Sequence, residues 1–223
     1  MMIVINTNDG SSTIELPELG WTYHSKHGAI NESQHVFIEA GLLYYLDRNP
    51  EPEVHIFEMG FGTGLNCLLS FKVTQELPIK VYYTGIEMHP LHDSVYNSLN
   101  YCLNEQLYVL KDVFQQMHSS EWEKPVKLSS SFQLTKINAD IRNFIPHKSY
   151  DVIYFDAFAP GDTPDQWTED IFKRFYTVLN PQSVFVTYSS KVIVRRALES
   201  AGFSVHKIPG PAGKREIVRA IKQ

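Results

Sequence analysis

The sequence predicts an α/β fold in which helices cover both faces of a mostly parallel sheet. Short apolar segments typical of buried strands alternate along the chain with segments whose apolar residues recur at helical spacing. A glycine-rich loop, Gly60 to Gly64, stands between the first buried strand and the helix after it. The last two predicted strands have only a Gly/Pro loop between them, so they should form an antiparallel hairpin at one edge of the sheet.

An N-terminal extension, residues 1–50, is expected to pack on a core domain, residues 51–223. The extension should begin with a hairpin of Ile3–Ile5 and Thr13–Leu16, because the Asn-Asp-Gly sequence between them favours a turn. A helix follows, with Asn31 as its expected N-cap, and two prolines stop it. The aromatic and His-rich stretch before that helix gives no clear prediction.

The core domain is predicted to contain five strands alternating with helices, followed by the terminal hairpin. The expected strands are Val54–Met59, Lys80–Glu87, Phe132–Ile137, Tyr150–Phe155, Ser183–Tyr188, Phe203–Ile208 and Glu216–Ile221. The expected helices are Leu65–Gln75, His89–Met117, Ile171–Leu179 and Val192–Ser200, with Trp122–Ser131 as a polar connection and Asn180-Pro181 closing the third helix. This order is typical of Rossmann-like methyltransferases, whereas nicotinamide dehydrogenases usually continue with another strand–helix unit.

Composition limits the classes of protein to consider. The 223 residues are 43% hydrophobic, which is enough for one sizeable core. The formal net charge is −5, so any contact with RNA must come from a local basic patch. Cys67 and Cys102 are far apart, which argues against a disulfide framework or a structural zinc site. No signal peptide or membrane span is recognisable, so we expect a cytoplasmic protein with no membrane partner.

The glycine loop has a spacing that favours S-adenosylmethionine over a dinucleotide. A dinucleotide fingerprint is G-x-G-x-x-G, whereas this loop is G-x-G-x-G and follows Glu58, whose carboxylate would repel a pyrophosphate and suits a cationic methionine end. Glu87 ends the second strand and could accept both ribose hydroxyls, and Asp140 follows the third strand, where it could bind the adenine amino group. The predicted cofactor contacts are Glu58, Gly60, Phe61, Gly62, Thr63, Gly64, Asn66, Glu87, Met88, Asp140 and Asp156. A nicotinamide or flavin nucleotide and a purely structural glycine turn are the alternatives.

The fourth strand runs into Asp156-Ala157-Phe158-Ala159-Pro160, beside the expected methyl group. Methyl transfer is an in-line displacement, so the enzyme must align a lone pair with the S–CH₃ bond. An amine nucleophile must also be neutral, and a carboxylate could orient it and take its proton. We therefore predict that Asp156 is the acceptor and base, and that Phe158 stacks on a planar substrate. A strand-end cap for Asp156 and core packing for Phe158 are the structural alternatives.

Several stretches of the chain match the motifs of one methyltransferase family. Glu58 to Asn66 has the pattern E-x-G-F-G-T-G-x-N, Asp156 to Trp167 the pattern D-x-F-A-P…P-x-x-W, and Glu32 to Phe37 the pattern E-S-x-x-V-F. Further matching stretches are Thr187–Ser190, Val194–Arg196, Ala201–Phe203 and Gly213–Glu216. Together they resemble the bacterial tRNA 5-methylaminomethyl-2-thiouridine methyltransferases, and the resemblance runs from about His24 to Ala220.

This resemblance implies N-methylation of the 5-aminomethyl group of the wobble 2-thiouridine in tRNA, with Asp156 and Phe158 facing the modified base. In that family the domain is either free-standing or fused to an FAD-dependent oxidase. At 223 residues the chain resembles the free-standing form, which would bind the tRNA anticodon loop and could act after a separate FAD-dependent oxidase. A methyltransferase of the same fold acting on a small-molecule or other amine, and a non-catalytic RNA-binding module, are the alternatives.

Basic residues gather in the last third of the chain and include Lys191, Arg195, Arg196, Lys207, Lys214, Arg215 and Arg219. If they share a face with the mouth of the active site, they can bind tRNA phosphates despite the net negative charge. The predicted substrate contacts are Phe158, Pro160, Trp167, Lys191, Arg195, Lys214 and Arg215. A solvated charged surface is the alternative.

Two histidine pairs have spacings that suggest a metal site. His24-x-x-His27 and His89-x-x-His92 both lack a clear third ligand, and methyl transfer needs no metal, so we predict none. The segment from residue 92 to residue 131 carries no motif with a recognisable role.

Overall fold

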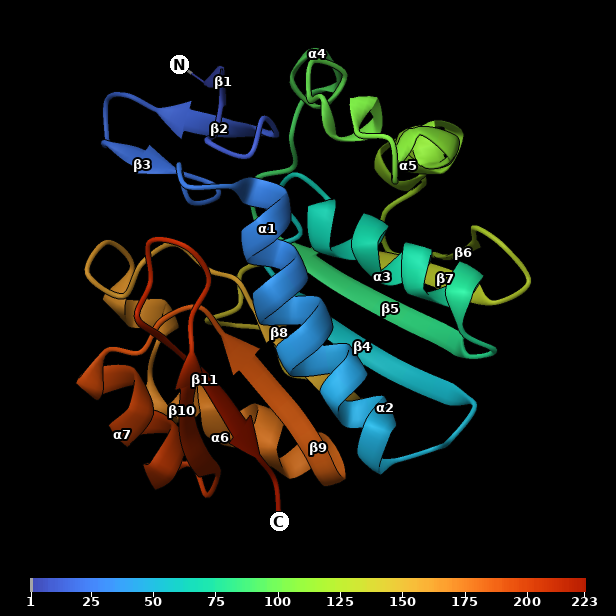
Figure 1. Cartoon of the computed structure of the whole chain (residues 1–223). Helices are drawn as coiled ribbons and strands as arrows, with labels where there is room; N and C mark the ends of the chain where they lie inside the picture. Colours follow the sequence, from blue (N-terminus) through green and yellow to red (C-terminus); the bar gives the residue numbers. More distant parts are fainter. Residues whose placement is uncertain (1) are drawn as a thin grey trace.

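The computed structural model describes residues 2–223 and has the predicted α/β architecture (Figure 1). Its main sheet has eight strands in the order β10-β11-β9-β8-β4-β5-β7-β6. The strands are β4 (Glu53–Met59), β5 (Lys80–Glu87), β6 (Pro125–Lys127), β7 (Phe132–Asn138), β8 (Tyr150–Phe155), β9 (Leu179–Thr187), β10 (Ser204–Pro209) and β11 (Glu216–Ile221). The five central strands are parallel, and β10 and β11 form the predicted antiparallel hairpin at one edge.

A small three-stranded antiparallel sheet precedes the main sheet in the chain. It consists of β1 (Ile3–Asn6), β2 (Ser12–Leu16) and β3 (Trp21–Thr22), so the predicted N-terminal hairpin is confirmed and extended by one short strand. Residues 23–28 connect β3 to a long helix that begins at Ala29, and the small sheet lies at the upper left of Figure 1, above the main sheet.

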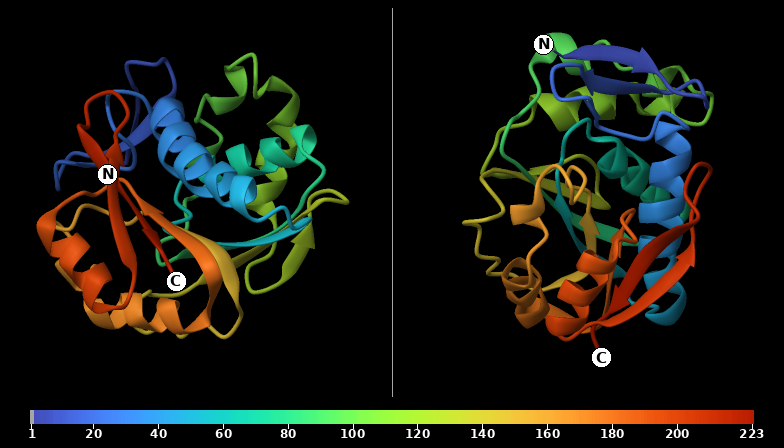
Figure 2. Two further views of the ribbon diagram at one scale, coloured as in Figure 1. Left: turned by 60° about the horizontal axis from the view of Figure 1, so that its bottom comes forward. Right: turned by 90° about the vertical axis from the view of Figure 1, so that its left-hand side faces the viewer.

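Helices cover both faces of the main sheet, as the left-hand view of Figure 2 shows. One face is covered by a long continuous helix, which consists of α1 (Ala29–Ser33), the π-helical η1 (Gln34–Leu43) and α2 (Tyr44–Arg48). Two shorter helices, α3 (Leu65–Glu76) and α5 (Lys111–Ser119), lie on the same face. On the other face lie α6 (Glu169–Val178) and α7 (Val192–Ser200). Gly41 lets η1 approach the sheet, because a Cβ there would stand 2.9 Å from Cγ2 of Val186.

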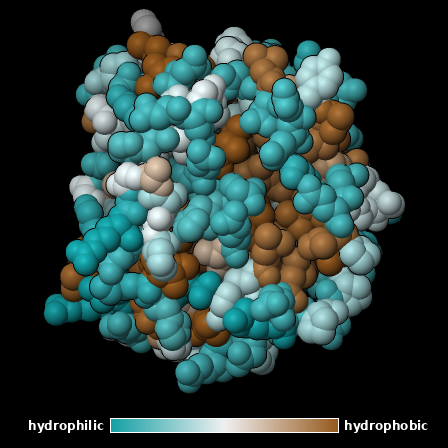
Figure 3. All heavy atoms as spheres, viewed as in Figure 1, coloured by the Kyte–Doolittle hydropathy of each residue, from teal (hydrophilic) through white to brown (hydrophobic). Residues whose placement is uncertain are grey.

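In the view of Figure 1, most of the surface is hydrophilic, and the apolar side chains gather to the right of its centre (Figure 3). Most of the large apolar side chains are buried in two clusters, one on each face of the main sheet. Because helices cover both faces of the sheet, a ligand can reach the sheet at the ends of its strands.

The start of the long helix was predicted wrongly. The helix begins at Ala29, and Asn31 lies inside its first turn rather than at the N-cap. The free amides of this turn are capped from a distant segment, because Asp9 accepts the Asn31 amide at 3.0 Å and Ser11 Oγ accepts the Ala29 amide at 3.1 Å. A tertiary contact has therefore replaced the local cap that the sequence indicated.

The helix predicted over His89–Met117 was also wrong for most of its length. The segment contains α4 (Asp93–Tyr96), the single turns η2 (Tyr101–Leu103) and η3 (Tyr108–Leu110), and then α5. Asn100 interrupts it, because its side chain accepts the Ser12 amide at 2.6 Å and donates to the Gly10 carbonyl at 2.9 Å. Side-chain bonds of this kind compete with helix formation.

Two smaller corrections concern connections. The polar stretch after α5 contains β6, which pairs antiparallel with β7. Asn180 and Pro181 do not separate α6 from the next strand, because β9 begins at Leu179 directly after the helix. Within residues 2–223, no helix has the length and apolar character needed to cross a bilayer. The division of the chain into residues 1–50 and 51–223 stays a prediction.

Candidate active site

A cavity of about 440 Å³ opens at the carboxyl ends of the parallel strands. Its walls come from residues 20–25, 59–63, 65–66, 86–89, 139–141 and 156–159, together with Glu32, Asp162, Thr163, Gln166, Tyr188 and Lys214. The strand ends of β4, β5, β7 and β8 therefore meet at one site, which is where open α/β sheets bind their ligands.

The glycine loop and Asp156 are fixed against each other at the centre of this cavity. The amides of Gly60 and Phe61 both donate to the Ile86 carbonyl at 3.0 Å, and the Asp156 amide donates to the Met59 carbonyl at 3.0 Å. Gly60 has a φ of 87°, and a Cβ there would stand 2.5 Å from the Asp156 carbonyl oxygen. Only glycine allows the loop after β4 to pass so close to the end of β8.

Glu87 ends β5 with its carboxylate on the cavity wall. Its Oε2 accepts the Gly62 amide at 3.0 Å and its Oε1 accepts the His89 amide at 2.8 Å, which fixes the orientation of the carboxylate. Burial raises the pKa of this carboxyl, and the two amides oppose that shift. Each oxygen keeps a further lone pair, so Glu87 can still accept hydrogen bonds from a ligand.

Two other predicted cofactor contacts lie near Glu87 on the wall. Met88 is exposed beside it. Asp140 lines the cavity, but Arg142 Nε donates to its Oδ2 at 2.7 Å, and this hydrogen bond lowers the pKa of the Asp140 carboxyl.

Glu58 and Gly64 lie behind the wall rather than on it. Glu58 is only 1% exposed, and burial raises its pKa well above the usual range of a carboxyl group. Gly64 has a φ of 71° and begins α3 without lining the cavity. Asn66 connects Glu58 to the site, because its Nδ2 donates to Glu58 Oε1 and to Asp156 Oδ2, both at 2.9 Å.

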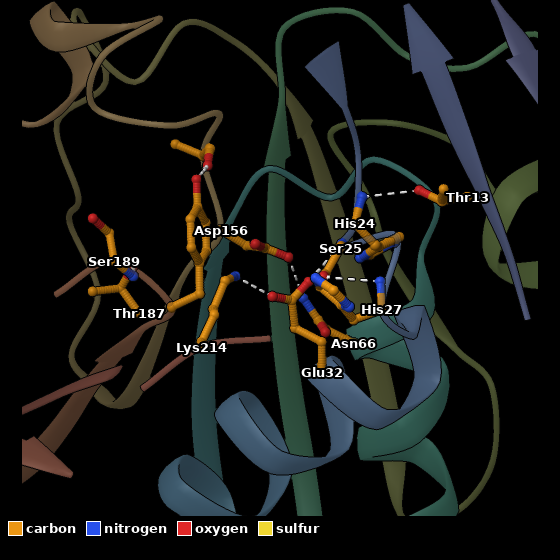
Figure 4. Close-up of polar contacts among 12 residues, drawn as sticks. Thr13, His24, Ser25, His27, Glu32, Asn66, Asp156, Thr187, Ser189 and Lys214 are labelled. Carbon is orange, nitrogen blue, oxygen red and sulfur yellow. Dashed lines mark hydrogen bonds and ion pairs between the residues drawn. The ribbon is translucent and has the colours of Figure 1, made fainter. Parts of the chain in front are cut away.

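Asp156 presents its carboxyl group to the cavity (Figure 4). Burial raises its pKa to about 7, and the nearby carboxylate of Glu32 acts in the same direction. The hydrogen bond from Asn66 and the charge of Lys214 oppose this shift. An aspartate with this pKa can accept and release a proton near neutral pH, which is what a general base requires.

Glu32 and Lys214 form an ion pair that closes one side of the cavity (Figure 4). Glu32 Oε2 also accepts the Ser25 amide at 2.8 Å, and Lys214 Nζ lies 4.1 Å from the centre of the Tyr188 ring. The hydroxyl of Tyr188 donates to the Ala157 carbonyl at 2.8 Å. Lys214 was predicted from the sequence as a tRNA contact, whereas the pairing with Glu32 was not foreseen.

An aromatic cluster forms the side of the cavity that faces β3. The Trp21 and Phe158 rings have their centroids 5.0 Å apart, and Tyr23 meets Phe158 edge-on at 5.3 Å. A Cβ on Gly62 would stand 3.1 Å from the Tyr23 ring, so Tyr23 also reaches the glycine loop. The sequence pointed to Phe158 but missed Trp21 and Tyr23, whose only signal was the high aromatic content of a segment without periodicity.

His24 ties the same segment to the glycine loop. Its Nε2 lies 2.7 Å from Thr63 Oγ1, and burial lowers the pKa of His24 to about 4, so the ring is neutral at physiological pH. The first of the two histidine pairs noted in the sequence thus contributes a structural contact to the site.

The remaining predicted substrate residues lie outside the cavity. Trp167 is 2% exposed, and its Nε1 donates to the Phe158 carbonyl at 2.9 Å, so it supports the loop from behind. Pro160 is buried and does not line the cavity. Lys191 and Arg215 are exposed, and Arg195 is half-buried with its Nε 3.4 Å from the Ser190 carbonyl.

The cavity fits S-adenosylmethionine in size and in the groups that it offers. Its volume lies in the usual range for small-molecule sites. Two acceptor oxygens at its wall, Asn66 Oδ1 and Gln166 Oε1, are buried without a hydrogen-bond partner among residues 2–223. Glu87 and Asp156 add carboxylates, and such a donor-poor wall suits a ligand rich in ammonium, amino and hydroxyl groups.

The chain is similar to several known proteins. The family model described as S-adenosyl-L-methionine-dependent methyltransferase matches residues 105–223. The protein "tRNA 5-methylaminomethyl-2-thiouridine biosynthesis bifunctional protein MnmC" of Methylobacillus flagellatus is 29% identical over 208 residues, which cover 89% of this chain and 32% of that protein. The protein of the same name from Burkholderia vietnamiensis is 31% identical over 217 residues, which cover 91% of this chain and 32% of that protein.

A solved structure, MNMC2 from Aquifex aeolicus, superposes with a TM-score of 0.81 at 24% identity, covering 99% of this chain and 69% of that one. At this identity the likeness shows the fold alone. The chain spans about one third of the length of the two bifunctional relatives.

Proposed function

The chain belongs to the family of S-adenosyl-L-methionine-dependent methyltransferases, and on this basis we propose that it methylates the amine of 5-aminomethyl-2-thiouridine at the wobble position of tRNA. The observation that carries the proposal is the placement of Asp156. Its half-buried carboxyl group lies between the glycine loop, which is on the cofactor side, and the aromatic cluster, which suits a planar base. The relatives that match nine tenths of the chain are named for the biosynthesis of tRNA 5-methylaminomethyl-2-thiouridine, and this name supports the proposed substrate.

The residues proposed to hold the cofactor are those of the glycine loop together with Glu87, Met88, Asp140 and Asn66. When bound, the cofactor supplies an electrophilic methyl group on a sulfonium. Glu58 is proposed to act indirectly: it fixes the side chain of Asn66, which in turn holds Asp156. The role of a direct contact, which the sequence suggested for Glu58, is thereby replaced by a positioning role.

Asp156 is proposed to prepare the amine for attack. An aminomethyl group is cationic in water, and it has no lone pair until it loses a proton. With a pKa of about 7, the Asp156 carboxylate can accept that proton and then keep the nitrogen oriented through the remaining N–H group. Asn66 holds Asp156 Oδ2 at 2.9 Å, so the other oxygen is left for the substrate.

Trp21, Tyr23 and Phe158 are proposed to hold the base. Aromatic side chains stack on unpaired bases without needing to read their edges. A wobble nucleotide lies in a loop, so turning it out of the anticodon stack costs less than extraction from a duplex. A separate FAD-dependent oxidase that supplies the aminomethyl substrate, and a cytoplasmic location where tRNA is modified, belong to the same proposal.

The test is mass spectrometry of wobble nucleosides after undermodified tRNA is incubated with the protein and S-adenosylmethionine. We expect the mass of the aminomethyl nucleoside to rise by one methyl group, only in tRNAs whose wobble base is uridine. Methylation of free small amines with no change in tRNA would favour an enzyme of the same fold with another substrate. Binding of tRNA without methyl transfer to any amine would favour a non-catalytic module.

A further inference from the structure

A second cleft adjoins the active-site cavity at the start of α7. It has a volume of about 270 Å³ and is lined by Tyr188, Ser189, Ser190, Lys214, Arg215 and Glu216. Tyr188 and Lys214 also line the cavity, so the two hollows share a wall. We call the second one the side cleft. The two hollows are therefore neighbours, with the side chains of Tyr188 and Lys214 between them.

The side cleft is lined by a serine hydroxyl that makes no hydrogen bond to the protein. Ser189 is only 5% exposed, and its Oγ has no hydrogen-bond partner in the part of the chain that the structure describes. Its amide is engaged separately, at 3.4 Å from Thr187 Oγ1. Figure 4 shows the Ser189 side chain directed away from Asp156 and from the Glu32–Lys214 pair. Since this hydroxyl lines the side cleft and makes no bond to the protein, it is free to donate a hydrogen bond to a ligand there.

The groups around Ser189 favour an anion. Arg215 lines the side cleft and is exposed. Lys191 is exposed outside that lining, with its Nζ beside Gly161, and forms no ion pair within residues 2–223. The one carboxylate on the wall, Glu216, is held by Lys207 Nζ, which donates to both of its oxygens at 3.0 Å. Lys191 is also the N-cap of the nine-residue helix α7 and gives that helix no side-chain cap, so the first amides of α7 add positive potential.

We propose that the side cleft binds a phosphodiester group of the RNA strand next to the target nucleotide. This inference rests on the proposed function, because it requires an RNA substrate. With the base in the cavity, a neighbouring phosphate of the strand can lie beyond Tyr188, where the adjoining side cleft offers phosphate donors. Ser189 supplies a hydroxyl donor, and Arg215 supplies charge. Lys214 remains with Glu32 at the shared wall.

A charged contact with phosphate depends on the salt concentration, whereas a hydrogen bond from a hydroxyl does not, and this difference is the basis of the test. The affinity of the full chain for undermodified tRNA is measured over a range of salt concentrations. Arg215→Gln should weaken binding and reduce the slope of log K against log salt by about 0.7, the value for one single-strand phosphate contact. Ser189→Ala should weaken binding by about tenfold and leave the slope unchanged, because it removes a hydrogen bond but no charge.

Lys148→Gln is the matched control. It removes one exposed positive charge at the opposite, amino-terminal end of β8, and both affinity and slope should stay close to the wild-type values. Binding of S-adenosylmethionine checks that each variant is folded. If Ser189→Ala fails to fold, Arg215→Gln still tests the inference, because Arg215 is exposed and its replacement should not disturb folding.

A second measurement separates this inference from the proposed function. With the nucleoside 5-aminomethyl-2-thiouridine, which carries no phosphate, Arg215→Gln should methylate as fast as the wild type. An equal loss on nucleoside and tRNA, or an unchanged affinity and salt slope for tRNA, would overturn the phosphate site while leaving tRNA methylation intact. If the wild type methylates neither substrate, the proposed function itself has failed.

Discussion

The two halves of the active-site cavity are built in different ways. The cofactor half comes from loops that each directly follow a strand of the parallel sheet, at residues 59–66, 86–89 and 139–141. The substrate half is assembled from Trp21 to Ser25, Glu32, the loop after β8, Tyr188 and Lys214, which lie far apart in the sequence. One half follows from the geometry of the sheet, whereas the other depends on how separate segments pack together.

The halves also differ in what their charges do. In the cofactor half, Glu87 is held by two backbone amides and serves as a fixed acceptor. In the substrate half, the pKa of Asp156 is set by burial and by two charged side chains, Glu32 and Lys214, that come from opposite ends of the chain. A fixed acceptor suits binding, and an adjustable carboxyl group suits proton transfer, so variants of the two halves should fail in different ways.

The largest effect is expected for Asp156→Asn. The amide has the same shape and can still accept the hydrogen bond from Asn66, but it cannot take a proton from the amine. Turnover should fall by about 100-fold or more, the usual contribution of a general base, while S-adenosylmethionine affinity stays unchanged. Single-turnover methylation and calorimetric cofactor binding measure the two quantities. Unimpaired turnover would remove Asp156 from its proposed role.

Glu87→Gln should give the reciprocal result. The amide group would place a donor against the Gly62 or His89 amide and would remove the anionic acceptor. We expect S-adenosylmethionine affinity to fall by about 10- to 100-fold, the cost of a lost hydrogen bond to a charged group. Turnover at saturating cofactor should remain within a few-fold of the wild type. A variant that loses turnover and keeps its affinity would show that the two halves are not separate in function.

Trp21→Ala tests the aromatic side of the substrate half, without changing the charges of Glu32, Lys214 or Asp156. Loss of the indole beside Phe158 should raise KM for tRNA by roughly tenfold, within the range for stacking of one base on an aromatic side chain. Cofactor affinity should not change, because Trp21 lies on the aromatic side of the cavity. Trp122→Ala is a matched control, since Trp122 does not line the cavity. Equal KM values for the two variants would contradict the proposed base site.

A smaller effect is expected on the pH dependence of turnover. Because the carboxylate of Asp156 is the active form, kcat/KM for wild type should rise with pH through about 7. Lys214→Met removes the cation that lowers the pKa of Asp156, so the rise should move to higher pH. Glu32→Gln removes the carboxylate that raises this pKa, so the rise should move to lower pH.

The double variant of Glu32 and Lys214 is the control for that pair of shifts. It removes both charges, and its pH profile should lie between those of the two single variants. Glu58 and Tyr188 also interact electrostatically with Asp156, but they are the same in all four proteins. Identical profiles for the two single variants would show that the ion pair does not act on Asp156.

The smallest effect is expected for Glu58→Gln. Burial raises the pKa of Glu58 well above its usual range, which favours the uncharged carboxyl form, and the amide oxygen of glutamine can still accept from Asn66. Cofactor affinity should therefore change by less than about 1 kcal/mol, the order of one ordinary hydrogen bond. A loss as large as that of Glu87→Gln, measured by calorimetry, would return Glu58 to the role of a direct ionic contact.

The sequence by itself determined the sheet and most of the cofactor half. The boundaries predicted for Lys80–Glu87 and Val192–Ser200 are those of β5 and α7, because apolar periodicity is a local property. Parallel strands bring their carboxyl ends to one edge, so strand order alone is enough to place Gly60, Glu87 and Asp156 at the same site. Asn31 shows where this reasoning fails, because its helix is capped by Asp9 and Ser11 from another segment.

Only the tertiary structure decided the substrate half and the ionisation of the site. Glu32 and Lys214 stand 182 positions apart, and nothing in the spacing of either motif indicates that they pair. Trp21 and Tyr23 reach Phe158 only because β3 packs over the strand ends. Burial raises the pKa of both Asp156 and Glu58, and Glu58 does not line the cavity. Burial depends on how all the segments pack together, and a local pattern does not encode it.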